Sequence, residues 1–158
     1  MKLMDIVVKD AILPDLKSTS RDDAVTEMVD ALVDANALSS ELRDEFIRAI
    51  IKREKRGSTG FGHGVAVPHV KHTSIKDMAV AIGISHRGID FNALDKQPVY
   101  SIFLLLSPEE KPEDHLDAME AIFGNLSQET FRRFLRQAQA VDDVLVLLQE
   151  ADSRATMR

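Results

Sequence analysis

One histidine, at the end of a glycine-rich stretch, is the residue of this chain whose setting most favours chemistry. Four of the seven glycines, Gly57, Gly60, Gly62 and Gly64, fall within eight residues, and His69 follows them. Glycine can adopt positive φ and lets the backbone approach a ligand, because it has no Cβ. An imidazole beside such a backbone can accept a phosphoryl group if the ring is neutral, if its second nitrogen is held by a hydrogen bond, and if donors meet the incoming charge.

Groups that could meet this charge lie nearby in the sequence. They are the hydroxyl of Thr59 and the backbone N–H groups of the glycine-rich stretch, in particular those of Gly60, Gly62 and Gly64. We interpret these four residues as candidates for phosphate binding. For His69 considered alone, a structural or exposed histidine remains an open alternative.

Arg53 could supply a cation from a predicted helix. It continues an apolar stripe, three residues after Ile50 and seven after Phe46. A guanidinium on that side of a helix either reaches an anion, or packs its stem and caps the last carbonyls of the helix. The residues alone favour the second interpretation.

Other kinds of site fit less well. His69 could share a metal ion with His63 or His72, but no carboxylate at ligand spacing completes the set, and nearby Lys71 would oppose a cation. A dinucleotide site is disfavoured because the glycines of residues 60–64 precede a predicted strand, whereas a pyrophosphate-binding turn opens a helix. The Gly-Lys-Ser/Thr ending of a P-loop is absent as well. We therefore expect no metal and no cofactor.

Composition limits the class of protein. The 158 residues, 44% of them hydrophobic, predict one domain over residues 1–158 with a real core. The net charge of −6 argues against nucleic acid or an anionic membrane as the main partner. The sequence has no cysteine, no apolar run of membrane-spanning length and no signal-peptide pattern at its N-terminus. We therefore expect a cytoplasmic protein.

Hydrophobic periodicity places the candidate residues on secondary structure. Apolar spacing predicts three helices, from Ser20 to about Asn36, from Ser39 or Ser40 through Arg53, and from Pro112 to Leu126. Ser127 is predicted to cap a fourth helix, with Phe131, Phe134 and Leu135 facing inward, and a fifth helix is predicted around Val144–Leu148. Short runs of β-branched and other apolar residues predict strands at Val65–Val67, Met78–Ser85 and Val99–Leu106, with an edge strand near the N-terminus and a polar connection at Lys71–Ser74. This order predicts an α/β (α+β) fold with a single mixed β-sheet of about five strands flanked by helices.

Six segments, grouped in three separated parts of the chain, resemble the fructose/mannitol-type IIA domain of the bacterial phosphoenolpyruvate-dependent sugar phosphotransferase system. The matching segments are Arg53-Glu54-Lys55, Ser58-Thr59-Gly60, Gly62-x-Gly64-Val65-Ala66-Val67-Pro68-His69, Gly88-Ile89-Asp90-Phe91-x-Ala93-x-Asp95-x-x-Pro98-Val99, Leu106-Ser107-Pro108 and His115-Leu116. The resemblance covers essentially the whole chain. It implies that His69 accepts the phosphoryl group, that Arg53 neutralises the phosphate, and that His115 is a second imidazole of the site.

The resemblance also implies a function and partners. Such domains accept a phosphoryl group from phosphohistidine on the carrier HPr, or on a paralogue of HPr, and in transport systems they pass it to a cysteine of a IIB domain. This chain looks more like the nitrogen-regulatory branch, in which phosphorylation controls binding to target proteins. The alternatives are a sugar-transport IIA component that serves a separate IIB, and a regulatory module that binds without chemistry.

Overall fold

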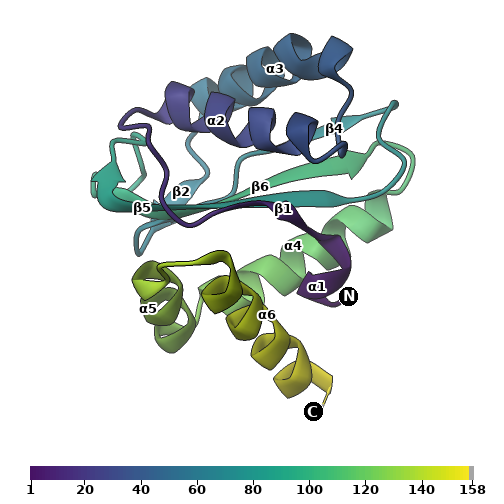
Figure 1. The fold of residues 1–158 in the computed structure, drawn as a ribbon. Helices are drawn as coiled ribbons and strands as arrows, with labels where there is room; N and C mark the ends of the chain where they lie inside the picture. Colours follow the sequence, from purple (N-terminus) through teal and green to yellow (C-terminus); the bar gives the residue numbers. More distant parts are fainter. Residues whose placement is uncertain (157–158) are drawn as a thin grey trace.

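A mixed β-sheet lies between two layers of helices (Figure 1). The computed structural model describes residues 1–156. The strands are β1 (Val7–Leu13), β2 (Gly60–Gly62), β3 (Val65–Ala66), β4 (His69–His72), β5 (Ala79–Ile89) and β6 (Val99–Pro108). They follow the order β1-β5-β6-β3-β2, and β4 also pairs with β6. The β1–β5, β3–β6 and β4–β6 pairs are parallel, whereas β5–β6 and β2–β3 are antiparallel.

Strands β3 and β4 continue one another along the same edge of β6. Val65 pairs with Ser101, and His69 pairs with Leu105 in the same register. The segment between them contains Pro68, which has no N–H to donate to a ladder, although its carbonyl accepts from Leu105 N at 3.0 Å. The proline therefore separates β3 from β4 one residue before His69.

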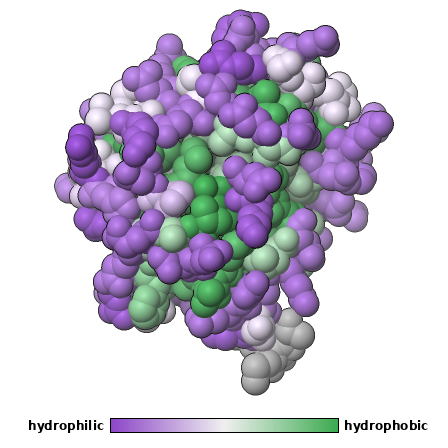
Figure 2. Space-filling view, viewed as in Figure 1, coloured by the Kyte–Doolittle hydropathy of each residue, from purple (hydrophilic) through white to green (hydrophobic). Residues whose placement is uncertain are grey.

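Helices cover both faces of this sheet. They are α1 (Leu3–Ile6), α2 (Arg21–Asp34), the short 3-10 helix η1 (Ser40–Leu42), α3 (Arg43–Arg56), α4 (Pro112–Leu126), α5 (Glu129–Gln137) and α6 (Val141–Thr156). Figure 1 shows α2 and α3 on one face, and α1, α4, α5 and α6 on the other. On the side drawn in Figure 2, hydrophobic residues gather in the middle, where the sheet lies between the two helix layers.

The central strands contribute side chains to two separate hydrophobic cores, one on each face of the sheet. On β6, Leu104 and Leu106 pack with α2 and α3, whereas Phe103 and Leu105 pack with the helices of the opposite face. Successive side chains of a strand point to opposite faces, so a strand that is covered on both sides is apolar at every position. This double burial explains the apolar run of residues 102–106 in β6, the part of the strand that pairs with the start of β4.

The predicted mixed sheet flanked by helices is confirmed. The sheet has six strands, because the glycine-rich stretch folds as the hairpin of β2 and β3 and because β4 follows Pro68. The polar connection expected at Lys71–Ser74 is wrong at its start, since Lys71 and His72 belong to β4. Within the described residues, no helix combines the length and the apolar character needed to cross a bilayer.

Helix boundaries agree with the sequence at one predicted cap and differ at another. Ser20 caps α2, because its side chain accepts a hydrogen bond from Asp23 N at 3.3 Å. Ser127 instead closes α4, where its hydroxyl donates to the Gly124 carbonyl at 3.0 Å. Phe134 is 53% exposed rather than inward, because the buried face of α5 is occupied by Phe131 and Leu135, four residues apart.

Candidate active site

His69 is the first residue of β4, and one of its ring nitrogens is held by a hydrogen bond. Its Nδ1 lies 2.9 Å from the carbonyl oxygen of Val67. A carbonyl can only accept a hydrogen bond, so Nδ1 carries the proton and donates it. In the neutral ring, the other nitrogen, Nε2, therefore keeps its lone pair. The half-buried His69 meets two of the conditions for a nucleophilic imidazole, a fixed ring and an available lone pair.

His115 lies beside His69, although 46 residues separate them in sequence. The two ring centroids are 5.6 Å apart, and the ring planes are inclined by 54°. His115 sits in the first turn and a half of α4 and is only 7% exposed. Its Nδ1 is 2.8 Å from the hydroxyl oxygen of Ser107, which donates its own proton to Met78 Sδ at 3.2 Å. The Ser107 hydroxyl thus holds the His115 ring through Nδ1, and Nε2 is the ring nitrogen left for another partner.

Burial lowers the pKa of His115 below its ordinary value of 6.5, and the positive charge of Lys71 and the neighbouring His69 lower this pKa further. All three causes disfavour the imidazolium form. The dipole of α4 acts in the same direction, because a helix N-terminus disfavours a cation. At neutral pH the second imidazole of the pair is thus uncharged.

Alternation along β4 separates its side chains into two groups. His69 and Lys71 share one strand face, and Lys71 is close enough to His115 to affect its pKa. His72 lies on the other face, where its ring contacts Phe46 of α3 at 4.8 Å between centroids. Sequence reasoning did not place Lys71 in the site, although its spacing of two residues from His69 within a strand was a signal for it.

The same alternation along β4 points His69 and His72, two of the candidate metal ligands, to opposite faces of the strand. His72 Nε2 lies 2.5 Å from Glu45 on α3, away from the partner of His69 on α4. In the part of the chain that the structure describes, no group of three or more His, Cys, Asp or Glu side chains could hold a metal ion.

The glycine-rich stretch is a tight hairpin rather than an open loop. His63 and Gly64 connect β2 to β3 with φ of 61° and 74°, and two consecutive positive φ values are typical of a type I′ turn. A Cβ on Gly60 would lie 2.9 Å from the Cβ of Ala93, so the close approach of these segments requires glycine. The Gly60 N–H donates to the Ser58 hydroxyl at 3.0 Å.

These contacts locate the four predicted phosphate-binding residues. Gly60 and Gly62 form β2, and the carbonyl of Gly64 accepts from Tyr100 N at 2.8 Å and from Ser101 N at 3.1 Å. Thr59 is 2% exposed, and its hydroxyl donates to the carboxylate of Glu54. Their role in phosphate binding stays a prediction.

Helix α3 buries Glu54, the neighbour of the candidate cation Arg53. Its fully buried row is Phe46, Ile50 and Glu54, spaced by four residues, whereas Arg53 lies at the edge of that row and is half-buried. The Glu54 carboxylate also accepts from Thr59 N, at 3.0 and 3.3 Å to its two oxygens. Sequence reasoning missed Glu54, although the spacing of four from Ile50 pointed to it.

Arg53 contacts the segment that leads from α3 into the hairpin. Its Nη1 donates to the carbonyl of Gly57 at 2.7 Å. Among the described residues it forms no ion pair with a carboxylate, so its positive charge is not neutralised. The capping interpretation is thus met in part, and the charge remains available to an anion.

Known proteins resemble this chain in sequence. The family described as "Phosphoenolpyruvate-dependent sugar phosphotransferase system, EIIA 2" matches residues 5–151. The chain is 36% identical over 150 residues to the "Nitrogen regulatory protein" of Bradyrhizobium diazoefficiens, which covers 93% of this chain and 96% of that protein. It is 32% identical over 152 residues to the "PTS system fructose-specific EIIABC component" of Bacillus subtilis, and this match spans 96% of this chain but only 24% of that protein.

Solved structures agree with the fold. The nitrogen regulatory protein IIA-Ntr of Neisseria meningitidis superimposes with a TM-score of 0.81 and 31% identity, over 90% of this chain and 96% of that one. The IIA of the Escherichia coli mannitol system, solved in complex with its phosphorylated enzyme IIB, superimposes with a TM-score of 0.74 and 19% identity, over 89% and 95% of the two chains.

Proposed function

Because this chain belongs to the EIIA type-2 family of the phosphoenolpyruvate-dependent sugar phosphotransferase system, we propose that it accepts a phosphoryl group on Nε2 of His69. IIA domains of this system act as phosphoryl carriers. The observation that carries the finer assignment is the hydrogen bond from His69 Nδ1 to the Val67 carbonyl, since it leaves Nε2 as the nucleophilic nitrogen.

In the proposed step, the Nε2 lone pair attacks the phosphorus of a phosphohistidine on the donor. The new N–P bond forms as the bond from phosphorus to the donor nitrogen breaks, and the donor nitrogen keeps that electron pair. The donor is HPr or an HPr-like carrier. Nδ1 of His69 keeps its proton throughout, so the Val67 carbonyl stabilises the positive charge that the ring gains.

Cationic groups on two elements support the transfer. Arg53 has no carboxylate partner among the described residues, and Lys71 shares a strand face with His69. Both would offset the charge of the phosphoryl oxygens, which is the main requirement of this chemistry. The arriving phosphate also raises the pKa of His115 and favours its imidazolium form, in which both ring nitrogens carry protons and Nε2 can donate to a phosphoryl oxygen.

A regulatory role is the branch that we favour. The chain is 36% identical over 96% of a nitrogen regulatory protein, and IIA-Ntr of Neisseria meningitidis superimposes with a TM-score of 0.81, although a fructose-specific EIIA component is also matched at 35% identity over 82% of its length. In this role the phosphoryl charge is a switch that alters the affinity for target proteins. We also propose that residues 1–158 act as one domain, located in the cytoplasm.

The alternative is a sugar-transport component. IIA domains of this system interact with IIB domains, as the mannitol complex illustrates. Because residues 1–158 contain no cysteine, a thiol acceptor would lie outside them, in a IIB. A further alternative is a module that binds regulatory targets without chemistry.

Two measurements test this proposal. Long-range ¹H–¹⁵N NMR of the unphosphorylated protein should show His69 protonated at Nδ1, and the phosphorylated protein should show phosphorus coupled to Nε2. A phosphate on Nδ1 would contradict the assignment. Mixing the phosphoprotein with a cysteine-bearing IIB then separates the branches, because a transport component discharges rapidly and a regulator stays phosphorylated.

A further inference from the structure

A second anion-binding site lies between α5 and the β2–β3 hairpin, away from the histidine pair. We propose that it takes a small phosphate monoester, of the size of a sugar phosphate or a mononucleotide, through Arg132 and Arg136. Ten residues line this cavity of about 470 Å³: His63, Gly64, Val65, Tyr100, Ser101, Glu129, Arg132, Arg133, Arg136 and Gln137. The volume falls within the range of small-molecule sites.

The arginines of this cavity are not paired with a carboxylate among the described residues. Arg132 and Arg136 are four residues apart and therefore lie on one face of α5. In residues 1–156, no carboxylate forms an ion pair with Arg132, Arg133 or Arg136, although Glu129 lines the same cavity. Arg132 donates to the carbonyl of Leu126 at 2.8 Å. Three positive charges against one negative charge make this cavity attractive to an anion, in a protein whose net charge is −6.

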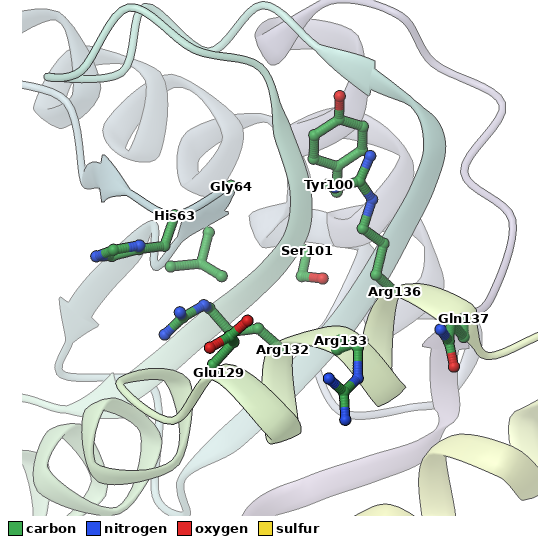
Figure 3. Close-up of a pocket in the computed structure, with 10 residues that line it drawn as sticks. His63, Gly64, Tyr100, Ser101, Glu129, Arg132, Arg133, Arg136 and Gln137 are labelled. Atoms are coloured by element: carbon green, nitrogen blue, oxygen red, sulfur yellow. The ribbon is translucent and has the colours of Figure 1, made fainter.

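Arg136 is held in place by the only tyrosine of the protein. Its guanidinium carbon lies 3.4 Å from the centroid of the Tyr100 ring, and Figure 3 shows its side chain extending along that ring. The ring itself is confined, because a Cβ on Gly64 or on Gly88 would lie 3.0 Å from it. Both glycines have positive φ, so the backbone around Tyr100 is shaped to admit the ring. A stacked guanidinium loses little freedom when it binds a phosphate, which favours affinity.

Arg132 approaches the cavity from the other end of the same helix face. In Figure 3 its side chain extends from α5 toward His63 of the hairpin turn. A smaller hollow of about 410 Å³ adjoins the cavity and shares His63, Gly64, Tyr100, Arg132 and Arg136 with it. Both arginines line both hollows, where their planar forks can bind phosphate oxygens, and Asp95 is the carboxylate that the smaller hollow adds.

This space is separate from the proposed phosphoryl-transfer site. It lies where Val65 pairs with Ser101, whereas His69 pairs with Leu105, four residues further along β6. Four residues of a strand span about 13 Å. His63, which sequence reasoning left without a role, lines this space rather than the histidine pair.

The experiment uses Tyr100 as a built-in reporter. The sequence has one tyrosine and no tryptophan, so tyrosine fluorescence comes from this site alone. We expect ribose 5-phosphate and glycerol 3-phosphate to change this fluorescence saturably at low salt, and the change to weaken at high salt. Adenosine 5′-monophosphate, titrated by calorimetry, separates a preference for nucleotides from a preference for sugar phosphates, and inorganic phosphate measures the contribution of the anion alone.

Variants make the test specific. Arg132→Gln leaves the contact between Arg136 and Tyr100 intact, so its fluorescence remains a valid reporter, and Arg136→Gln is followed by calorimetry. Each should weaken binding by about tenfold or more, because a charge-assisted hydrogen bond is lost. Arg48→Gln, on the exposed side of α3, removes the same charge elsewhere and should leave binding unchanged. His69→Ala should bind normally, which separates this proposal from the function proposed above.

The proposal has clear contrary results. It is overturned if none of the phosphate esters binds the wild-type protein, or if Arg132→Gln and Arg136→Gln bind as well as Arg48→Gln. It is also overturned if citrate, a carboxylate anion, binds as tightly as the phosphate esters.

Discussion

The buried contact between Glu54 and Thr59 gives the sharpest prediction about how the site is held. Glu54 ends the buried row of α3, and its carboxylate accepts from both the backbone N–H and the hydroxyl of Thr59. Both residues are 2% exposed, so water cannot replace a lost partner. The contact closes the connection from α3 to the hairpin, next to Arg53.

The expected cost follows from these partners. A hydrogen bond to a charged group contributes about 1.5–3 kcal/mol to the free energy of unfolding. Glu54→Gln keeps the shape and one acceptor oxygen but faces Thr59 with an amide donor, so we expect a loss of about 2 kcal/mol, or about 4–8 °C in Tm. Glu54→Ala leaves two buried donors unsatisfied and should cost about 3–4 kcal/mol. The control is Glu120→Gln on the exposed face of α4, which should lie within about 0.5 kcal/mol of wild type.

Urea unfolding of Glu54→Gln, Thr59→Val and the double variant completes the assay. The two residues touch, so the double-mutant cycle should give a coupling energy of about 1–2 kcal/mol. Additive effects within about 0.5 kcal/mol would refute the reasoning. The rate of phosphorylation should also fall in Glu54→Gln measured well below its Tm, since the segment that carries Arg53 loses its anchor.

Three further predictions concern charged groups. His115 has a lowered pKa, so the unfolded state binds its proton first as pH falls below 6.5; stability should therefore decline toward acid, and His115→Gln should show a shallower decline in unfolding free energy measured across that range. Asp152 on α6 accepts hydrogen bonds from Leu3 N at 2.7 Å and from Met4 N at 2.9 Å, so Asp152→Asn should lower the free energy of unfolding by about 1–2 kcal/mol in thermal or urea denaturation. Glu150→Gln is the exposed control, and equal stability of the two variants would contradict this prediction. Lys71→Gln should slow phosphoryl transfer about tenfold without abolishing it, as measured by rapid quench, and an unchanged rate would exclude a role for this cation in the transfer.

Much of the fold could be predicted because it depends on periodicity. The double-sided burial of β6 is visible as the five consecutive apolar residues 102–106, and the cap at Ser20 is visible as a serine three residues before an acidic residue. Strand β4 could not be predicted in this way. Its four residues alternate between the histidine pair and α3, so neither face gives an apolar signal.

The sequence names candidate residues for the site but does not give their geometry. Positions 53 and 54 follow Ile50 by three and four residues, and periodicity alone cannot tell which one a helix buries; packing places Glu54 inside and Arg53 at the edge. The hydrogen-bond partner of His69 Nδ1 cannot be read from the sequence. Only the turn of the chain at Pro68, which brings the Val67 carbonyl back to the ring, determines which nitrogen is free.

Intact-mass measurement after incubation with phosphoenolpyruvate, enzyme I and HPr tests the central claim most directly. The wild-type protein and His63→Ala should each gain a single acid-labile phosphoryl group, because His63 lies at the hairpin turn and outside the histidine pair. Arg53→Ala should gain it more slowly, and His69→Ala should gain none while keeping its fold. Retention of the phosphoryl group by His69→Ala, or its loss in His63→Ala alone, would contradict the account.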